Sequence, residues 1–130
     1  MEHQRVLIDT SILIDHLRKK QKQKTTFFKL AYNFDCVISA VTKFEFAVGT
    51  TPRNREFVEK LLASFPVLPF DALCAQTAVE IYHGLKAKNK LISLPDIFIA
   101  ATALANDLTL YTLNRKDFER IENLKLGSKW

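Results

Sequence analysis

The chain has 130 residues, of which 48% are hydrophobic, and a formal net charge of +5. This length suits a single domain over residues 1–130, and this composition supports a folded core and excludes an intrinsically disordered chain. No apolar run reaches the roughly 18 residues of a membrane span, and the N-terminus lacks the apolar segment of a secretory signal, so we expect a cytoplasmic protein.

The first half of the chain alternates between hydrophobic periods of two and of 3.6 residues. In chain order, this pattern predicts a strand over residues 4–8, a helix over 11–20, a helix with the apolar stripe 27–34, a strand over 36–39 and a helix over 41–48. Gly49 is expected to end the last of these helices.

The second half continues the alternation, with prolines as boundary signals. The pattern predicts a helix opened by Pro52, a strand at 67–68, a helix from its N-cap Asp71 to Lys88, a helix from Pro95 to about Asn106, a strand over 108–112, a short helix through Glu119 and an edge strand around 124–126.

Such alternation is typical of an α/β fold. We predict a central, mostly parallel sheet of four to five short strands, flanked by helices on both faces. Ligands bind such sheets at the carboxyl ends of the strands. Asp9 and Asp117 fall just beyond strand ends, while Glu45 and Asp96 fall in the first two turns of helices. We therefore expect these four acids to converge on one edge of the sheet.

Asp9 and Glu45 both have an apolar sequence context. Asp9 ends the run 6–8, which argues against a loose surface loop, although it is also a suitable helix N-cap, as are Thr10 and Ser11. Glu45 lies on the apolar side of its predicted helix, where a solvated acid is not expected. Snorkelling or a salt bridge is the alternative explanation for Glu45.

Asp96 and Asp117 complete the set. Asp96 opens a helix that is apolar nearly all round, and its alternative role is a favourable interaction with the helix dipole. Asp117 follows the last predicted strand together with Thr112 and Asn114, although Asn114 is also a suitable cap for the short helix.

Carboxylates near a core are costly unless their charge is compensated, and a divalent cation held by oxygen ligands compensates it. An acidic pocket on a basic protein suggests a polyanion that is held by the surface and cut at a metal. Arg115 and Lys116 flank the predicted pocket and are candidate RNA contacts. Arg18 and Lys19 are further candidates, although their run of positive charge is more typical of a solvated helix end.

The remaining polar candidates fit structural roles. These are an ion pair for Asp15, a cap for Asp71, a turn for Asp107, and burial of the thiols Cys36 and Cys74.

Four segments together resemble the PIN-domain family, and more narrowly its VapC-type toxins of type II toxin–antitoxin pairs. They are Ile8–Asp15, Glu45–Gly49, Pro95–Ala103 and Thr112–Phe118. The resemblance implies a Mg²⁺- or Mn²⁺-dependent endoribonuclease, with metal ligation by Asp9 and Asp96 and with Glu45 and Asp117 completing the acidic set. It also implies a homodimer and a small VapB-like antitoxin, in an assembly that can be larger than the dimer.

The chemistry expected from this resemblance is in-line attack by metal-bound water, which leaves a 5′-phosphate and a 3′-hydroxyl. Thr10, Ser11, Thr112 and Asn114 would orient ligands or waters. Two alternatives stay open at this point. One is a non-catalytic PIN-like module that binds RNA or a partner. The other is a phosphate-accepting receiver or phosphatase, against which the lack of an Asp-x-Asp pair after the first strand argues.

Overall fold

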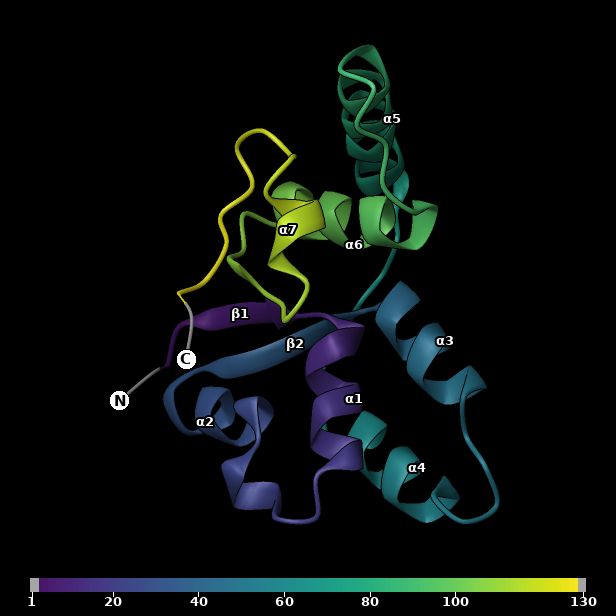
Figure 1. Cartoon of the computed structure of the whole chain (residues 1–130), viewed down its shortest axis with the longest axis vertical. Helices are drawn as coiled ribbons and strands as arrows, with labels where there is room; N and C mark the ends of the chain where they lie inside the picture. Colours follow the sequence, from purple (N-terminus) through teal and green to yellow (C-terminus); the bar gives the residue numbers. More distant parts are fainter. Residues whose placement is uncertain (1–2, 129–130) are drawn as a thin grey trace.

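The computed structural model describes residues 3–128. Its four strands are all parallel, in the spatial order β3-β2-β1-β4, and Figure 1 shows β1 and β2 crossing the middle of the molecule. The strands are β1 (Arg5–Ile8), β2 (Asp35–Ser39), β3 (Val67–Leu68) and β4 (Leu110–Tyr111). The predicted α/β fold with a parallel sheet is confirmed.

Strand β1 lies at the centre of the sheet and is buried on both faces. Successive side chains of a strand point to opposite faces, and accordingly Leu7 packs into one hydrophobic cluster while Val6 and Ile8 pack into the other. Val37 and Ile38 of β2 divide in the same way. Both faces of the sheet are therefore covered by helices, as predicted.

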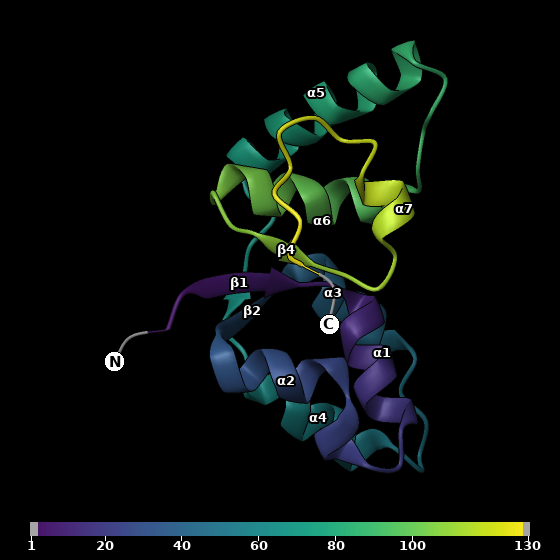
Figure 2. The ribbon, with the colours of Figure 1, turned by 60° about the vertical axis from the view of Figure 1, so that its left-hand side comes forward.

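The helices form a layer on each face, which Figures 1 and 2 show above and below the sheet. One layer contains α5 (Ala72–Ala87), α6 (Leu94–Ala105) and α7 (Arg115–Phe118); the other contains α1 (Thr10–Arg18), the 3₁₀ turn η1 (Lys22–Lys24), α2 (Thr26–Asn33) and α4 (Arg55–Ala63). Helix α3 (Ala40–Val48) contacts both α1 and α6. It therefore stands beside the carboxyl ends of β1 and β2. Within residues 3–128 no helix is long and apolar enough to cross a membrane.

Three boundary predictions are wrong. Pro52 does not open a helix, because residues 52–54 form a turn and α4 begins at Arg55. In this turn the Asn54 side chain accepts a hydrogen bond from the backbone N–H of Thr51 at 2.8 Å, and such local bonds compete with a helix. The strand predicted over 108–112 is only Leu110–Tyr111.

The third wrong boundary is the edge strand predicted at 124–126. In its place, Leu126 forms a single parallel bridge to Leu110. The N–H of Gly127 then donates to the carbonyl of Leu110 at 2.9 Å, and a Cβ at Gly127 would overlap the ring of Tyr111. This close approach fastens the C-terminal segment along β4, but pairing is too brief to form a fifth strand.

Candidate active site

Asp9 is the most buried of the four acids. It directly follows β1, and its side chain caps α1 by accepting a hydrogen bond from the N–H of Ser11 at 3.1 Å. Its exposed fraction is 3%. The structure thus gives Asp9 the N-cap position for which Thr10 and Ser11 were alternatives, while also placing its carboxylate at the carboxyl end of the central strand.

Two hydroxyl groups fix both oxygens of the Asp9 carboxylate. The Ser11 hydroxyl donates to Oδ1 and the Thr112 hydroxyl donates to Oδ2, each at 2.5 Å. In turn, the Ser11 Oγ accepts from the N–H of Leu113, and the Thr112 Oγ1 accepts from the N–H of Asn114, both at 2.9 Å. These bonds join the start of α1 to the segment after β4.

Glu45 approaches the same region from α3. Its Oε1 accepts a hydrogen bond from the Thr10 hydroxyl at 2.6 Å, and Thr10 Oγ1 lies 3.3 Å from the Thr42 hydroxyl. Thr42 is buried one helical turn before Glu45. Sequence reasoning missed Thr42, although its position three residues before Glu45 puts both side chains on the same side of the helix.

Asp96 lies in the first turn of α6, after the N-cap Ser93, whose hydroxyl accepts from the Asp96 N–H at 3.4 Å. Asp117 lies in α7 and contacts two partners: the Asn114 amide donates to it at 3.3 Å, and the Arg120 guanidinium lies 3.7 Å away. Asn114 occupies the N-cap position of α7 without forming a side-chain cap bond. Its side chain instead holds Asp117.

The pKa values show that the acids influence one another. Burial raises the pKa of Asp9 to about 6, against the lowering effect of its hydrogen bonds, and the negative charge of Asp96 raises it further. The pKa of Asp96 is also raised, first by burial and then by the charges of Glu45 and Asp117. The charge of Asp96 therefore interacts with each of the other three acids, while their convergence on one metal site stays a prediction.

The donor chemistry of this group fits a hard divalent cation, because carboxylate and hydroxyl oxygens are the ligands that Mg²⁺ and Mn²⁺ prefer. A cation would also relieve the unfavourable charge that Asp9 and Asp96 share. The side chains are not gathered tightly, however: within residues 3–128, no three acidic, histidine or cysteine side chains lie close enough to hold an ion as they stand.

Several of the predicted basic contacts are engaged in the fold. Arg115 donates to the carbonyl of Gly127 and lies 3.6 Å from Glu119, and Lys19 pairs with Asp15 at 3.0 Å. Lys22, four residues after Arg18, also has a structural role, because its ammonium donates to three carbonyls at the end of α1. Arg18 and Lys116 are exposed.

The residues predicted to be structural are so placed. Asp71 caps α5, Asp107 adopts a positive φ of 51° and pairs with Lys125 at 2.8 Å, Cys74 is buried, and Cys36 is half-buried. Burial raises the pKa of the Cys36 thiol to about 11, which leaves it protonated and unreactive at neutral pH.

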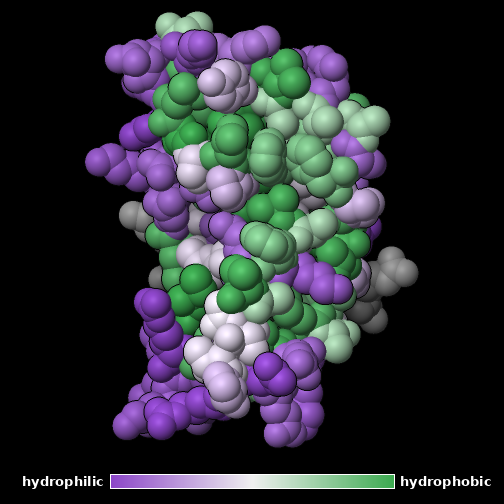
Figure 3. All heavy atoms as spheres, turned by 90° about the vertical axis from the view of Figure 1, so that its right-hand side faces the viewer, coloured by the Kyte–Doolittle hydropathy of each residue, from purple (hydrophilic) through white to green (hydrophobic). Residues whose placement is uncertain are grey.

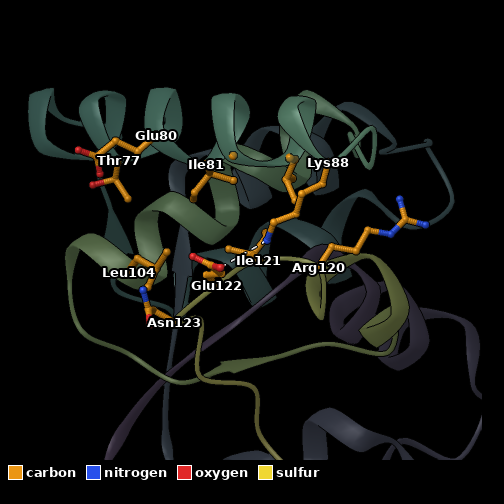
Figure 4. A pocket seen from close by; sticks show the side chains of 11 residues that line it. Thr77, Glu80, Ile81, Lys88, Leu104, Arg120, Ile121, Glu122 and Asn123 are labelled. Carbon is orange, nitrogen blue, oxygen red and sulfur yellow. Dashed lines mark hydrogen bonds and ion pairs between the residues drawn. The ribbon is translucent and has the colours of Figure 1, made fainter.

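A cavity of about 360 Å³ lies away from this acidic group, between α5, the end of α6 and the segment after α7 (Figure 4). Its charged side chains are partly neutralised by one another, since Lys88 lies 3.5 Å from Glu122. Arg120, at its rim, points away from the other labelled side chains in Figure 4 and is the residue that contacts Asp117. Nothing in this cavity resembles a set of reactive groups.

Curated relatives match this chain over nearly its whole length. "Ribonuclease VapC1" of Methanocaldococcus jannaschii is 30% identical over 126 residues, which cover 96% of this chain and 87% of that protein. "Ribonuclease VapC10" of Mycobacterium tuberculosis is 34% identical over 120 residues, which cover 92% and 90%.

Solved structures share the fold. VapBC2 from Rickettsia felis, bound to a DNA fragment from its promoter, matches with a TM-score of 0.83 and 26% identity, covering 97% of this chain and 99% of that one. DNA-bound VapBC from Salmonella typhimurium also matches with a TM-score of 0.83 and 26% identity, covering 95% and 97%. The family model of the PIN domain matches residues 6–124, and the chain therefore belongs to the PIN-domain family.

Proposed function

We propose that this protein is a metal-dependent endoribonuclease, that it is the toxin of a type II toxin–antitoxin pair, and that residues 1–130 form one nuclease domain. The observation that carries the proposal is the buried carboxylate of Asp9, which two hydroxyl groups hold and whose pKa is raised mainly by burial and further by the charge of Asp96. Relatives named ribonuclease, at 30% and 34% identity, support RNA as the substrate. We place this activity in the cytoplasm, where such a substrate is met.

In this proposal Asp9 and Asp96 hold a Mg²⁺ or Mn²⁺ ion, with Glu45 and Asp117 completing the acidic set. Such a cation, when bound, would activate water and compensate charge on the phosphate. Burial is the main reason why the pKa values of Asp9 and Asp96 are raised, and neighbouring acids raise them further, so a bound cation would stabilise both carboxylates in their ionised form.

Hydrogen bonds from neighbouring side chains orient three of these acids. Ser11 and Thr112 keep the Asp9 carboxylate in one orientation, and Thr10 does the same for Glu45. Asn114 holds Asp117 in its place. The exposed Lys116 and Arg18 are available to attract the phosphates of RNA.

The partners we propose are a small antitoxin and a second copy of the chain. The similarity to the DNA-bound VapBC structures from Rickettsia felis and Salmonella typhimurium supports the antitoxin. An exposed apolar face on α3 and the start of α6 supports a protein partner, since Phe44 and Val48 are each 68% exposed and Leu94 is 52% exposed. Figure 3 shows hydrophobic side chains gathered across the middle of this side of the molecule.

The test compares wild type with Asp96→Asn, using Asp71→Asn as a matched control. Asp71 caps α5, and Asn is an equally good N-cap. With Mn²⁺, wild type and Asp71→Asn should cleave total RNA and leave 5′-phosphate ends, whereas Asp96→Asn should be slower by at least 100-fold, and chelator should stop all cleavage. In cells, only the first two should arrest growth.

Equal cleavage by Asp96→Asn would contradict the assignment of the acids, and cyclic phosphate ends that form in chelator would contradict the mechanism. Retained RNA binding without cleavage under any condition would favour the non-catalytic module. Acid-labile phosphorylation of Asp9 by a small phosphodonor would favour the receiver.

A further inference from the structure

A cavity of about 220 Å³ lies next to the acidic group, on the β4 side of Asp9. Thr112 belongs to both places, since its side chain lines the cavity and its hydroxyl donates to Asp9 at 2.5 Å. The cavity is smaller than the roughly 300–1,000 Å³ of pockets for drug-sized ligands. Such a volume suits a single small ring system, and through Thr112 the cavity lies beside the Asp9 carboxylate.

Several walls of this cavity are held by contacts within the protein. The backbone of Leu113 is bonded to the Ser11 hydroxyl at 2.9 Å. The ring of Tyr111 lies 5.3 Å from that of Phe34, measured between centroids, and it packs against Gly127 on the C-terminal segment. Such fixed walls lower the entropy cost of binding.

The lining combines apolar surface with a few polar groups. Ile12, Tyr111 and Leu113 supply the apolar part, and Thr26 and Ser128 supply hydroxyl groups. Arg115 also lines the cavity, but its guanidinium is engaged by the Gly127 carbonyl and by Glu119. Because the Arg115 guanidinium already contacts these two groups, it is a poor partner for a phosphate. The cavity therefore favours a flat, neutral ring that can form hydrogen bonds.

Leu113 offers an exposed apolar surface beside the cavity. Its side chain is 51% exposed although its backbone is held at the acidic site. An exposed apolar side chain on a fixed segment offers a surface against which a base can stack.

We propose that this cavity receives one unstacked nucleobase of the RNA, at a fixed position beside the cleaved bond. The proposal rests on the ribonuclease function proposed above. Proteins that read RNA sequence do so mainly on unstacked bases, which they stack on side chains and hydrogen-bond at the base edges. The cavity then selects where the chain is cut, while the acids perform the cutting.

The test uses two variants with different effects on the cavity, and a control for each. Thr26→Phe fills the cavity, and Leu113→Ala removes part of its wall. Thr77→Phe is the control for the first, because Thr77 lines the separate cavity of Figure 4. Leu73→Ala is the control for the second, because Leu73 is also an exposed leucine, at 58%.

Each protein is given a pool of single-stranded RNA of random sequence with Mn²⁺, and the cleaved ends are sequenced. Wild type should show a base preference at one position beside the cut. Thr26→Phe and Leu113→Ala should flatten the preference at that position alone and raise KM by about 5- to 150-fold, the range expected for one stacked base. Both should bind Mn²⁺ with wild-type affinity, and both controls should behave as wild type.

A base preference and KM equal to those of wild type in both cavity variants would overturn the proposal. The same changes in the two controls would overturn it as well. Absence of cleavage by wild type would instead overturn the ribonuclease function itself, so the two failures are distinguishable. If Thr26→Phe does not fold, Leu113→Ala decides the matter, because its change is at a half-exposed side chain.

Discussion

At the scale of single residues, Asp9 has two opposite effects on stability: its hydrogen bond to the start of α1 stabilises the fold, whereas the burial of its charge destabilises it. As the N-cap of α1 it stabilises the fold, but its charge is buried at 3% exposure and close to Asp96. Hydrogen bonds from Ser11 and Thr112 offset only part of the burial cost, so its pKa rises from the ordinary value of 3.8 to about 6. A protein that keeps such a group ionised at neutral pH loses stability unless a cation compensates the charge.

This raised pKa predicts how stability depends on pH in chelator. Between about pH 4 and pH 6 the folded protein binds more protons at Asp9 than the unfolded chain does, so the free energy of unfolding decreases as pH rises. The rise from 3.8 to about 6 corresponds to about 3 kcal/mol. Asp9→Asn should remove this decrease and be more stable than wild type at pH 7, by about 1–3 kcal/mol, as measured by urea unfolding.

The same experiment has an internal control. Adding Mn²⁺ should raise the stability of wild type at pH 7 and leave Asp9→Asn nearly unchanged, because ligand binding to the folded state adds to its stability. The raised pKa of Asp9 would be contradicted if the free energy of unfolding of wild type did not decrease between pH 4 and pH 6 more than that of Asp9→Asn.

The Thr10 hydroxyl provides a second prediction at this scale. It holds Glu45 with a 2.6 Å hydrogen bond, and removal of such supporting bonds typically costs 10- to 100-fold in metal affinity or activity. Thr10→Val keeps the shape of the side chain and should weaken Mn²⁺ binding and RNA cleavage by about that factor. Thr77→Val on α5 is the control and should change neither. Wild-type Mn²⁺ affinity in Thr10→Val would remove Glu45 from the set of ligands.

At the scale of elements, local signals predict most of the helices. Asp71 before α5 and Pro95 in α6 mark boundaries that the structure confirms within a residue or two. Pro52 misleads because the side chains of Thr51 and Asn54 make a better turn than a helix start. The C-terminal segment could not be predicted, because its position depends on contacts between residues far apart in sequence, among them the close approach of Gly127 to Tyr111, 16 residues away, and the bridge of Leu126 to Leu110.

That contact is testable by substitution of Gly127. A Cβ there would overlap the Tyr111 ring, so Gly127→Ala should lower the free energy of unfolding by about 1–3 kcal/mol, as overpacked substitutions do. Gly84→Ala in α5 is the matched control with the opposite sign. Its Cβ meets no atom within 4 Å, and alanine is about 1 kcal/mol better than glycine inside a helix. If Gly127→Ala raised the free energy of unfolding in urea, as Gly84→Ala is expected to do, the close packing of the C-terminal segment would be contradicted.

At the scale of the whole molecule, the candidate site depends on bringing distant segments together. The sequence predicts that the four acids converge, because strand ends and helix starts of a parallel sheet meet at one edge. This reasoning does not predict which hydroxyl group bonds to which acid. Thr112 bonds to Asp9, 103 residues away, and Thr10 bonds to Glu45, 35 residues away. They depend on side-chain rotamers that only the packed fold selects. For the same reason the sequence could not tell how far apart the carboxylates stand without a cation.

The apolar face on α3 and α6 is the other property of the whole molecule. A cavity of about 610 Å³ lies there, lined by Phe44, Val48, Pro95 and Phe98 among others. A water-exposed apolar surface with a hollow of this kind is typical of a protein interface. If a second copy covers it, a charge at its centre would be buried without a partner and would weaken association by several kcal/mol.

Phe44→Lys should therefore convert a wild-type dimer into a monomer in sedimentation velocity, while leaving the thermal unfolding of the fold itself close to that of wild type, because Phe44 is 68% exposed. Tyr32→Lys is the matched control, since Tyr32 is 78% exposed on α2, on another side of the molecule, and it should remain dimeric. A monomeric wild type would leave this face to the antitoxin, and a dimeric Phe44→Lys would place the dimer contact elsewhere. Because Phe44 adjoins Glu45 in α3, only the sedimentation result, and not the rate of RNA cleavage, reports on the interface.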